Sequence, residues 1–186
     1  MTQADVHTLP DSRRAGSQSS EPAPDPQRLL RLYLRDHDAA SAGGLQLLRR
    51  SCASNVDTQF GPVLADLLQQ VEQDAAALQG ITERLDVSHD PVKRAVAWVG
   101  VTLGGLKLNS RLVSYSPLSR VYEIEGLMAG VRAKSALWTT LQQVVKTDAR
   151  IDADELKRLK SRADEQLRTL DDLHGRAVAL AFDTKN

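Results

Sequence analysis

Apolar residues recur at intervals of three and four positions in five long segments of the chain. This spacing places the apolar side chains on one face of a helix and the polar side chains on the opposite face. No segment of useful length alternates with a period of two, so the pattern predicts no β-strands. The predicted helices span residues 26–53, 58–85, 91–113, 117–146 and 152–182.

Capping residues and prolines mark where these helices begin. Asp57 is the predicted N-cap of the second helix, and Asp152 begins the last one. Pro91 follows Ser88-His89-Asp90 at the start of the third helix, where proline is tolerated. In the first helix, recurring polar residues identify the face expected to lie in water: Arg31, Arg35, Asp38, Gln46 and Arg49.

Four of the predicted helices are about 27 to 31 residues long, or roughly 40 to 47 Å at about 1.5 Å per residue. Long helices joined by short loops fold back on one another, which predicts an all-α antiparallel bundle. Residues 91–113 leave two arrangements open. If this segment traverses the bundle lengthwise, the second and fourth helices run parallel, which is ferritin-like connectivity. If it packs as an equal member, the bundle has five helices.

Composition divides the chain into a tail and one domain. Residues 1–26 are rich in proline and serine and lack apolar periodicity, so we expect a disordered N-terminal tail before a helical domain at 27–186. Cys52 is the only cysteine, which excludes an intramolecular disulfide and favours a cytoplasmic location. The apolar run 95–106 covers about 18 Å as a helix, short of the roughly 30 Å that a membrane span needs.

Several ionisable residues lie on or beside the apolar faces. Burying an ionised group alone is costly, so such residues are paired, neutralised or bound to metal. If they converge in the bundle, carboxylates and imidazoles from four helices form a site for iron or manganese. The candidate ligands are His37, Glu72, Glu125, Asp171 and His174, with Asp36 and Asp74 as possible additions.

This set resembles the ferritin-like di-iron carboxylate superfamily, in which two helices each give one Glu and two give a Glu-x-x-His pair. Asp171-Asp172-Leu173-His174 looks like the paired motif with Asp in place of Glu, whereas Glu72-Gln73-Asp74-Ala75 lacks the His. Residues 29–182 also resemble a bacterial family of ferritin-like helical proteins. The resemblance lies in the sequence segments 33–37, 106–112 and 116–120. The second resemblance implies a fold and no activity.

One stretch of the chain carries charge of a single sign. Between residues 91 and 120 there are five basic residues and no acidic ones, in a chain whose formal net charge is zero. Lys93, Lys107 and Arg111 share a helix face and form a candidate patch for an anionic or membrane surface. Aromatic residues for base stacking are missing, so we expect no nucleic-acid partner.

No nucleotide-binding loop, paired CxxC, HExxH or Gly-x-Ser-x-Gly motif is present, so no catalytic residue is proposed and an enzyme is not the first expectation. The leading hypothesis is a helical bundle without a cofactor that acts by self-association or by binding another protein. The alternative is a ferritin-like protein that binds iron or manganese, which would make any activity a metal-dependent oxidoreductase. A third hypothesis is a peripheral membrane-surface binder.

Overall fold

The computed structural model describes residues 25–87, 115–144 and 148–183. These ranges hold four long helices: α1 (Pro26–Asn55), α2 (Gly61–Arg84), α4 (Pro117–Val144) and α5 (Ala153–Phe182). No strand occurs among the described residues, and the predicted all-α bundle is confirmed. The expected tail up to residue 24, the predicted helix at 91–113 and the basic patch Lys93, Lys107 and Arg111 lie outside the described residues.

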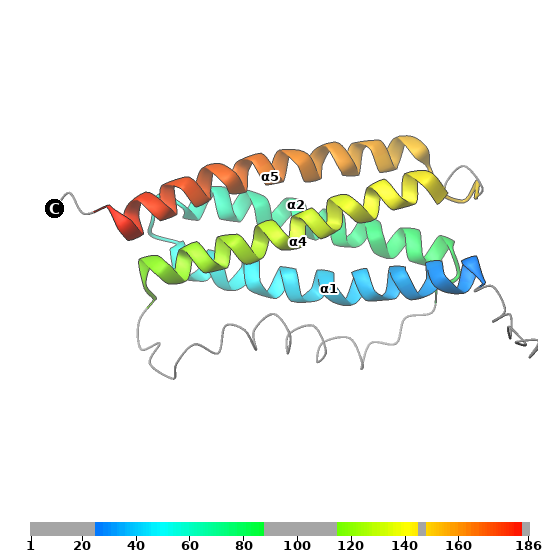
Figure 1. The fold of residues 1–186 in the computed structure, drawn as a ribbon, viewed down its shortest axis with the longest axis horizontal. Helices are drawn as coiled ribbons and strands as arrows, with labels where there is room; N and C mark the ends of the chain where they lie inside the picture. Colours follow the sequence, from blue (N-terminus) through cyan, green and yellow to red (C-terminus); the bar gives the residue numbers. More distant parts are fainter. Residues whose placement is uncertain (1–24, 88–114, 145–147, 184–186) are drawn as a thin grey trace, which may run out of the picture.

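The helices form two antiparallel hairpins, α1 with α2 and α4 with α5 (Figure 1). α2 ends at the end of the bundle where α1 begins, and α4 begins at the opposite end, so α2 and α4 run in the same direction. This is the orientation expected for the first of the two arrangements that the sequence left open. α1 also packs against α4, and ion pairs join α2 to α5.

Acidic side chains cap two of the helices. Asp25 accepts a 3.0 Å hydrogen bond from the backbone N–H of Gln27, and Asp152 accepts one of 2.8 Å from Asp154. Each bond satisfies an N–H group that has no partner within its own helix. The prediction for Asp152 is confirmed. Asp57 is not the N-cap of α2, because a turn in which the Gly61 N–H donates to the Thr58 carbonyl delays the helix start.

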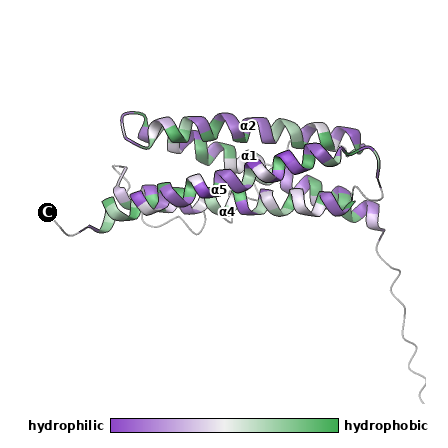
Figure 2. Cartoon of the chain, turned by 90° about the horizontal axis from the view of Figure 1, so that it is seen from above, coloured by the Kyte–Doolittle hydropathy of each residue, from purple (hydrophilic) through white to green (hydrophobic). Residues whose placement is uncertain are grey.

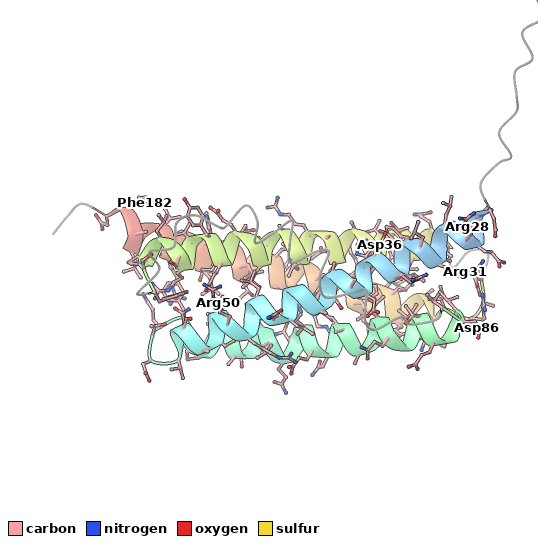
Figure 3. The ribbon with its side chains drawn as sticks, turned by 90° about the horizontal axis from the view of Figure 1, so that it is seen from below. Arg28, Arg31, Asp36, Arg50, Asp86 and Phe182 are labelled. Atoms are coloured by element: carbon pink, nitrogen blue, oxygen red, sulfur yellow. The ribbon has the colours of Figure 1, made fainter. Side chains whose placement is uncertain are left out.

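α2 ends in a left-handed residue, Asp86, with a φ of 53°. The Val87 N–H donates to the Thr82 carbonyl and the Asp86 N–H to the Glu83 carbonyl, which is the Schellman pattern. Val87 is buried after this turn. The turn thus ends the helix and anchors the end of α2 in the core. In Figure 3, Asp86 lies at the end of the bundle opposite Phe182.

The apolar faces meet along the bundle axis, and Figure 2 shows hydrophobic and hydrophilic residues interspersed along each helix, as amphipathic helices require. The most deeply buried large side chains are Trp138, Phe60, Leu34, Leu64, Ile81, Ile124, Leu137, Leu141, Leu156, Leu170 and Leu173. None of the helices in the described ranges is both long and apolar enough to cross a membrane.

Two acidic residues lie on faces other than those predicted. Asp38, expected on the exposed face of α1, is only 3% exposed. Glu125, expected in line with the core, has a side chain that is 50% exposed. Both lie at the margin of an apolar stripe, where the packing of neighbouring helices decides which way the side chain faces.

Candidate functional site

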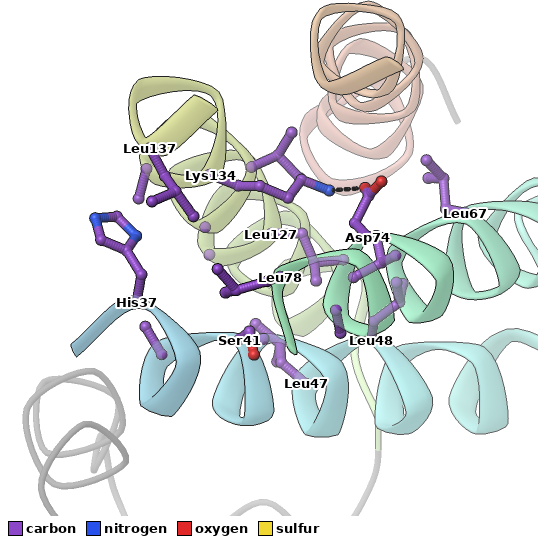
Figure 4. A pocket seen from close by; sticks show the side chains of 18 of the residues that line it. His37, Ser41, Leu47, Leu48, Leu67, Asp74, Leu78, Leu127, Lys134 and Leu137 are labelled. Atoms are coloured by element: carbon purple, nitrogen blue, oxygen red, sulfur yellow. Dashed lines mark hydrogen bonds and ion pairs between the residues drawn. The ribbon is translucent and has the colours of Figure 1, made fainter. Parts of the chain in front are cut away.

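A cavity of about 290 Å³ lies inside the bundle, between α1, α2 and α4. Its walls are mostly apolar, with leucine the commonest residue on these three helices and a contribution from Leu170 of α5. Figure 4 shows how the side chains are arranged around it, with His37 and Ser41 on α1 and Asp74 and Lys134 on the side of α2 and α4. The cavity therefore combines an apolar body with polar groups on two sides.

The cavity exists because small residues line it where α1 approaches α4. Glycine and alanine carry too little side chain to fill the space between two helices, and interiors are otherwise closely packed. A Cβ atom added at Gly44 or Gly130 would meet no heavy atom within 4 Å. The small lining residues on these two helices are Ala40, Gly44, Gly126, Gly130 and Ala133.

The buried carboxylate of Asp74 is the centre of the polar group that faces α4 and α5. We call Asp74, Lys134, Arg162 and Gln166 the Asp74 cluster. Arg162 Nε donates to Asp74 Oδ1 at 2.7 Å, and Gln166 Nε2 donates to Oδ2 at 3.0 Å. Lys134 Nζ donates to the same Oδ2 and to Gln166 Oε1. The cluster joins α2, α4 and α5 through one carboxylate that is 1% exposed.

The Asp74 cluster contains two cations and one carboxylate. Burial has the largest effect on the pKa of Lys134 and lowers it below its usual 10.5. The negative charge of Asp74 partly offsets this effect, and the positive charge of Arg162 adds to it. Arg162 also donates a 3.0 Å hydrogen bond to Gln73, whose side chain is neutral. No other carboxylate among the described residues contacts Lys134 or Arg162, so the cluster has an excess of one positive charge.

On the α1 side, His37 is half-buried at the cavity wall. Its ring packs edge-on against Tyr33, with 4.5 Å between the ring centroids. Burial lowers the pKa of His37 below 6.5, and the neighbouring Asp36 partly offsets this effect. His37 is therefore neutral at pH 7 and presents one N–H donor and one acceptor.

Trp138 also lines the cavity and is fully buried. Its indole Nε1–H has no hydrogen-bond partner. Because this side chain is fully buried, it offers no exposed polar atom to a molecule in the cavity.

A second buried acid, Glu123, holds one end of the bundle together. Its Oε2 accepts hydrogen bonds from Ser51 Oγ at 2.7 Å and from the Tyr115 hydroxyl at 3.0 Å. Arg50 Nε lies 3.2 Å from Oε1, close enough for an ion pair but without hydrogen-bond geometry. Burial raises the pKa of the Tyr115 hydroxyl, which keeps it protonated as a donor. Glu123 does not line the cavity between α1, α2 and α4, and its bond to Ser51 fixes α1 against α4.

The sequence-predicted metal ligands do not meet in one cluster. His174 Nε2 and Glu125 Oε1 lie 3.2 Å apart, the only contact within the predicted set among the described residues. Glu72 pairs with Arg49 on the surface, and Asp171 is exposed. Of the two possible additions, Asp74 lies in the Asp74 cluster and Asp36 lies at the cavity wall, as does His37. No group of three or more His, Cys, Asp or Glu residues that could hold a metal occurs in the described ranges.

Three polar residues of the described structure were not singled out by the sequence reasoning, although their spacing carried a signal. Lys134 lies between Val131 and Trp138 on the apolar stripe of α4, and Gln166 lies between Ala163 and Leu170 on that of α5. Glu123 precedes Leu127 by one helical turn. Each continues a buried stripe at an interval of three or four residues, as Asp74 does on α2.

The cavity thus has an apolar wall and a polar cluster with excess positive charge. Comparison with known proteins finds no matching family model, no similar curated protein and no similar solved structure.

Proposed function

We propose that this protein binds a small, largely apolar ligand in the cavity between α1, α2 and α4. The observation that carries the proposal is the cavity itself, with its leucine walls and a few polar groups that converge on it. Ligand sites are typically concave and mostly apolar, with a small number of polar groups that orient the ligand. The cavity between these helices has that composition.

The volume sets the size of the ligand. A cavity of roughly 150 Å³ holds benzene, so the 290 Å³ here admits a larger molecule. At roughly 30 Å³ for each water-sized atom, it holds about ten non-hydrogen atoms. Burying the apolar surface of such a molecule against the apolar lining is favourable.

The proposed function is binding rather than catalysis. Each charged group at the buried wall already has a partner within the protein, as Lys134 has in Asp74. His37 packs on Tyr33, and the Ser41 hydroxyl at the cavity wall donates to the backbone carbonyl of Asp38. The arrangement is suited to holding a molecule in place.

The test is a titration with octanamide, a neutral molecule of the estimated size. Wild-type protein should show saturable binding by calorimetry, a rise in melting temperature and a change in Trp138 fluorescence in a Trp98→Phe background. Gly130→Leu places a side chain in the cavity and should abolish binding. Gly175→Leu is the matched control, because Gly175 lies on α5 outside the cavity and an added Cβ there also meets nothing within 4 Å.

A binding curve that is unchanged in Gly130→Leu would contradict the proposal, as would the absence of saturable binding to folded wild-type protein. Circular dichroism of both leucine variants checks that the helices are retained. Because both substitutions replace a helical glycine, their effects on helix propensity are similar.

A second candidate function is self-association, supported by apolar side chains at the end of the bundle where α4 begins and α5 ends. Leu118, Tyr122, Leu180 and Phe182 are all exposed there. A second copy of the chain can cover such a patch with its own equivalent in a two-fold dimer. Light scattering should give a dimer that the Leu180→Lys, Phe182→Lys variant converts to monomer. A wild-type monomer at high concentration excludes this candidate.

A further inference from the structure

Lys134 places at the cavity wall an ammonium group whose three N–H donors are not all used within the protein. A protonated lysine has three N–H donors, and Lys134 directs two of them at Asp74 and Gln166. Lys134 also lines the cavity. Figure 4 shows its side chain extending across the wall toward Asp74. One donor therefore remains for an acceptor that enters the cavity.

The charge of the Asp74 cluster favours an anionic acceptor. Asp74 is a single carboxylate shared by Lys134 and Arg162, and Gln166 is neutral. Excess positive charge at a mostly buried site is costly, and a nearby negative charge offsets that cost. A charge-assisted hydrogen bond to Lys134 is also stronger than a neutral one.

We propose that the ligand of this cavity is a monocarboxylic acid with a short apolar body, its carboxylate held by Lys134 and its body in contact with the leucine wall. This inference rests on the proposed ligand-binding function and adds the chemical class of the ligand. The carboxylate supplies the missing negative charge and accepts from Lys134. The apolar body fills the space beside Gly44 and Gly130.

The other titratable groups that face the cavity add no further buried charge to it. His37 is neutral at pH 7, because burial lowers its pKa. Asp36 is exposed to water on α1, where its charge is screened. At the cavity wall Asp74 and Lys134 pair with each other, and Arg162, which lies next to them and does not line the cavity, adds one positive charge.

The test compares three probes of similar size at pH 7.5, all below their micelle concentrations: octanoate, octanamide and octylamine. Wild-type protein should bind octanoate at least tenfold more tightly than octanamide, and octylamine most weakly. Lys134→Gln should reduce the preference for octanoate over octanamide to less than about twofold. Lys160→Gln is the control, because Lys160 is also paired with an aspartate, Asp164, but does not line the cavity.

The outcomes separate the two proposals. If octanamide binds as tightly as octanoate to wild-type protein, carboxylate recognition is wrong and the ligand-binding function stands. If none of the three probes binds, the ligand-binding function itself is wrong. The wild-type comparison needs no substitution, so it decides the question even if Lys134→Gln does not fold.

A second readout reports on the carboxylate directly. The ¹³C signal of carboxyl-labelled octanoate, followed against pH, should titrate at a lower pH when bound than when free, because Lys134 stabilises the ionised form. In Lys134→Gln this difference should disappear. A bound octanoate that titrates at its free pH would overturn the assignment of its head group to Lys134.

Discussion

Arg162 and Asp74 lie 88 residues apart in the chain, and the guanidinium Nε of one donates a 2.7 Å hydrogen bond to the carboxylate of the other. The contact joins α5 to α2 inside the bundle. Lys134 of α4 contacts the same carboxylate, so three helices meet at one buried acid. The stability of the bundle should therefore depend strongly on Asp74.

Replacing Asp74 with Asn should lower the free energy of unfolding by about 3 kcal/mol, the lower end of the cost of breaking a buried ion pair. The lower end applies because the Arg162 side chain is 30% exposed. The variant leaves two cations side by side without their carboxylate. Urea unfolding at pH 7 measures the change.

The matched control is Glu72→Gln, which removes a carboxylate from the same helix. Glu72 is 45% exposed and pairs with Arg49, so its loss should cost less than about 1 kcal/mol. Adding Lys134→Met to Asp74→Asn should recover part of the loss, since it removes one unpaired cation. Equal effects of Asp74→Asn and Glu72→Gln would show that the Asp74 cluster contributes no more than a surface pair.

The hydroxyl of Tyr115 is expected to stabilise the protein through Glu123. Tyr115→Phe leaves this buried carboxylate with one hydroxyl donor fewer and should cost about 1 to 3 kcal/mol. Tyr122→Phe provides the control, because Tyr122 is exposed and its change should stay within about 0.5 kcal/mol. Chemical denaturation of both variants measures the difference. If the two tyrosine variants lose equal stability, the Tyr115 hydroxyl does not support Glu123.

Alanine at Gly130 should stabilise the protein. The new Cβ meets no atom within 4 Å, and alanine is favoured over glycine in a helix by about 1 kcal/mol. Gly61→Ala should have the opposite effect, because its Cβ would lie 2.7 Å from the backbone carbonyl oxygens of Asn55 and Val56. Melting temperatures measure both changes. A lower melting temperature for Gly130→Ala would mean that the space beside it is not open.

His37 should make stability depend on pH below neutrality. Its pKa in the folded protein lies below the unfolded value of 6.5, so between these two values the unfolded chain binds more protons. Stability is therefore complete above pH 6.5 and falls as the pH decreases toward the folded pKa. Because the ring is half-exposed, the loss should stay below about 1 kcal/mol.

Urea unfolding of wild-type protein and His37→Gln at pH 7.5 and 5.5 tests this expectation. The variant should lose less stability than wild type on acidification. His174→Gln, which lies outside the cavity, should leave the contribution of His37 in place. An identical pH dependence in wild type and His37→Gln would exclude His37 as its source.

The periodicity of the chain was sufficient to predict the helices, the bundle and the burial of Asp74. Helical spacing is a local property, so it assigns each side chain to a face without knowledge of the partner helix. Asp74 lies in the middle of an apolar stripe and must be buried wherever that stripe packs. The parallel directions of α2 and α4 were one of two alternatives that the sequence left open, and the structure decided between the directions.

Only the tertiary structure decided which residues at the edge of a stripe turn inward and which partners they meet. Glu123 is buried and Glu125 exposed because α4 is rotated so that Glu123 faces Ser51 of α1. The contacts of Asp74 with Lys134 and Arg162 join helices that are distant in sequence, and no pattern within one helix encodes them. The cavity has the same origin, since small residues on α1 and α4 leave a space only when those two faces pack against each other.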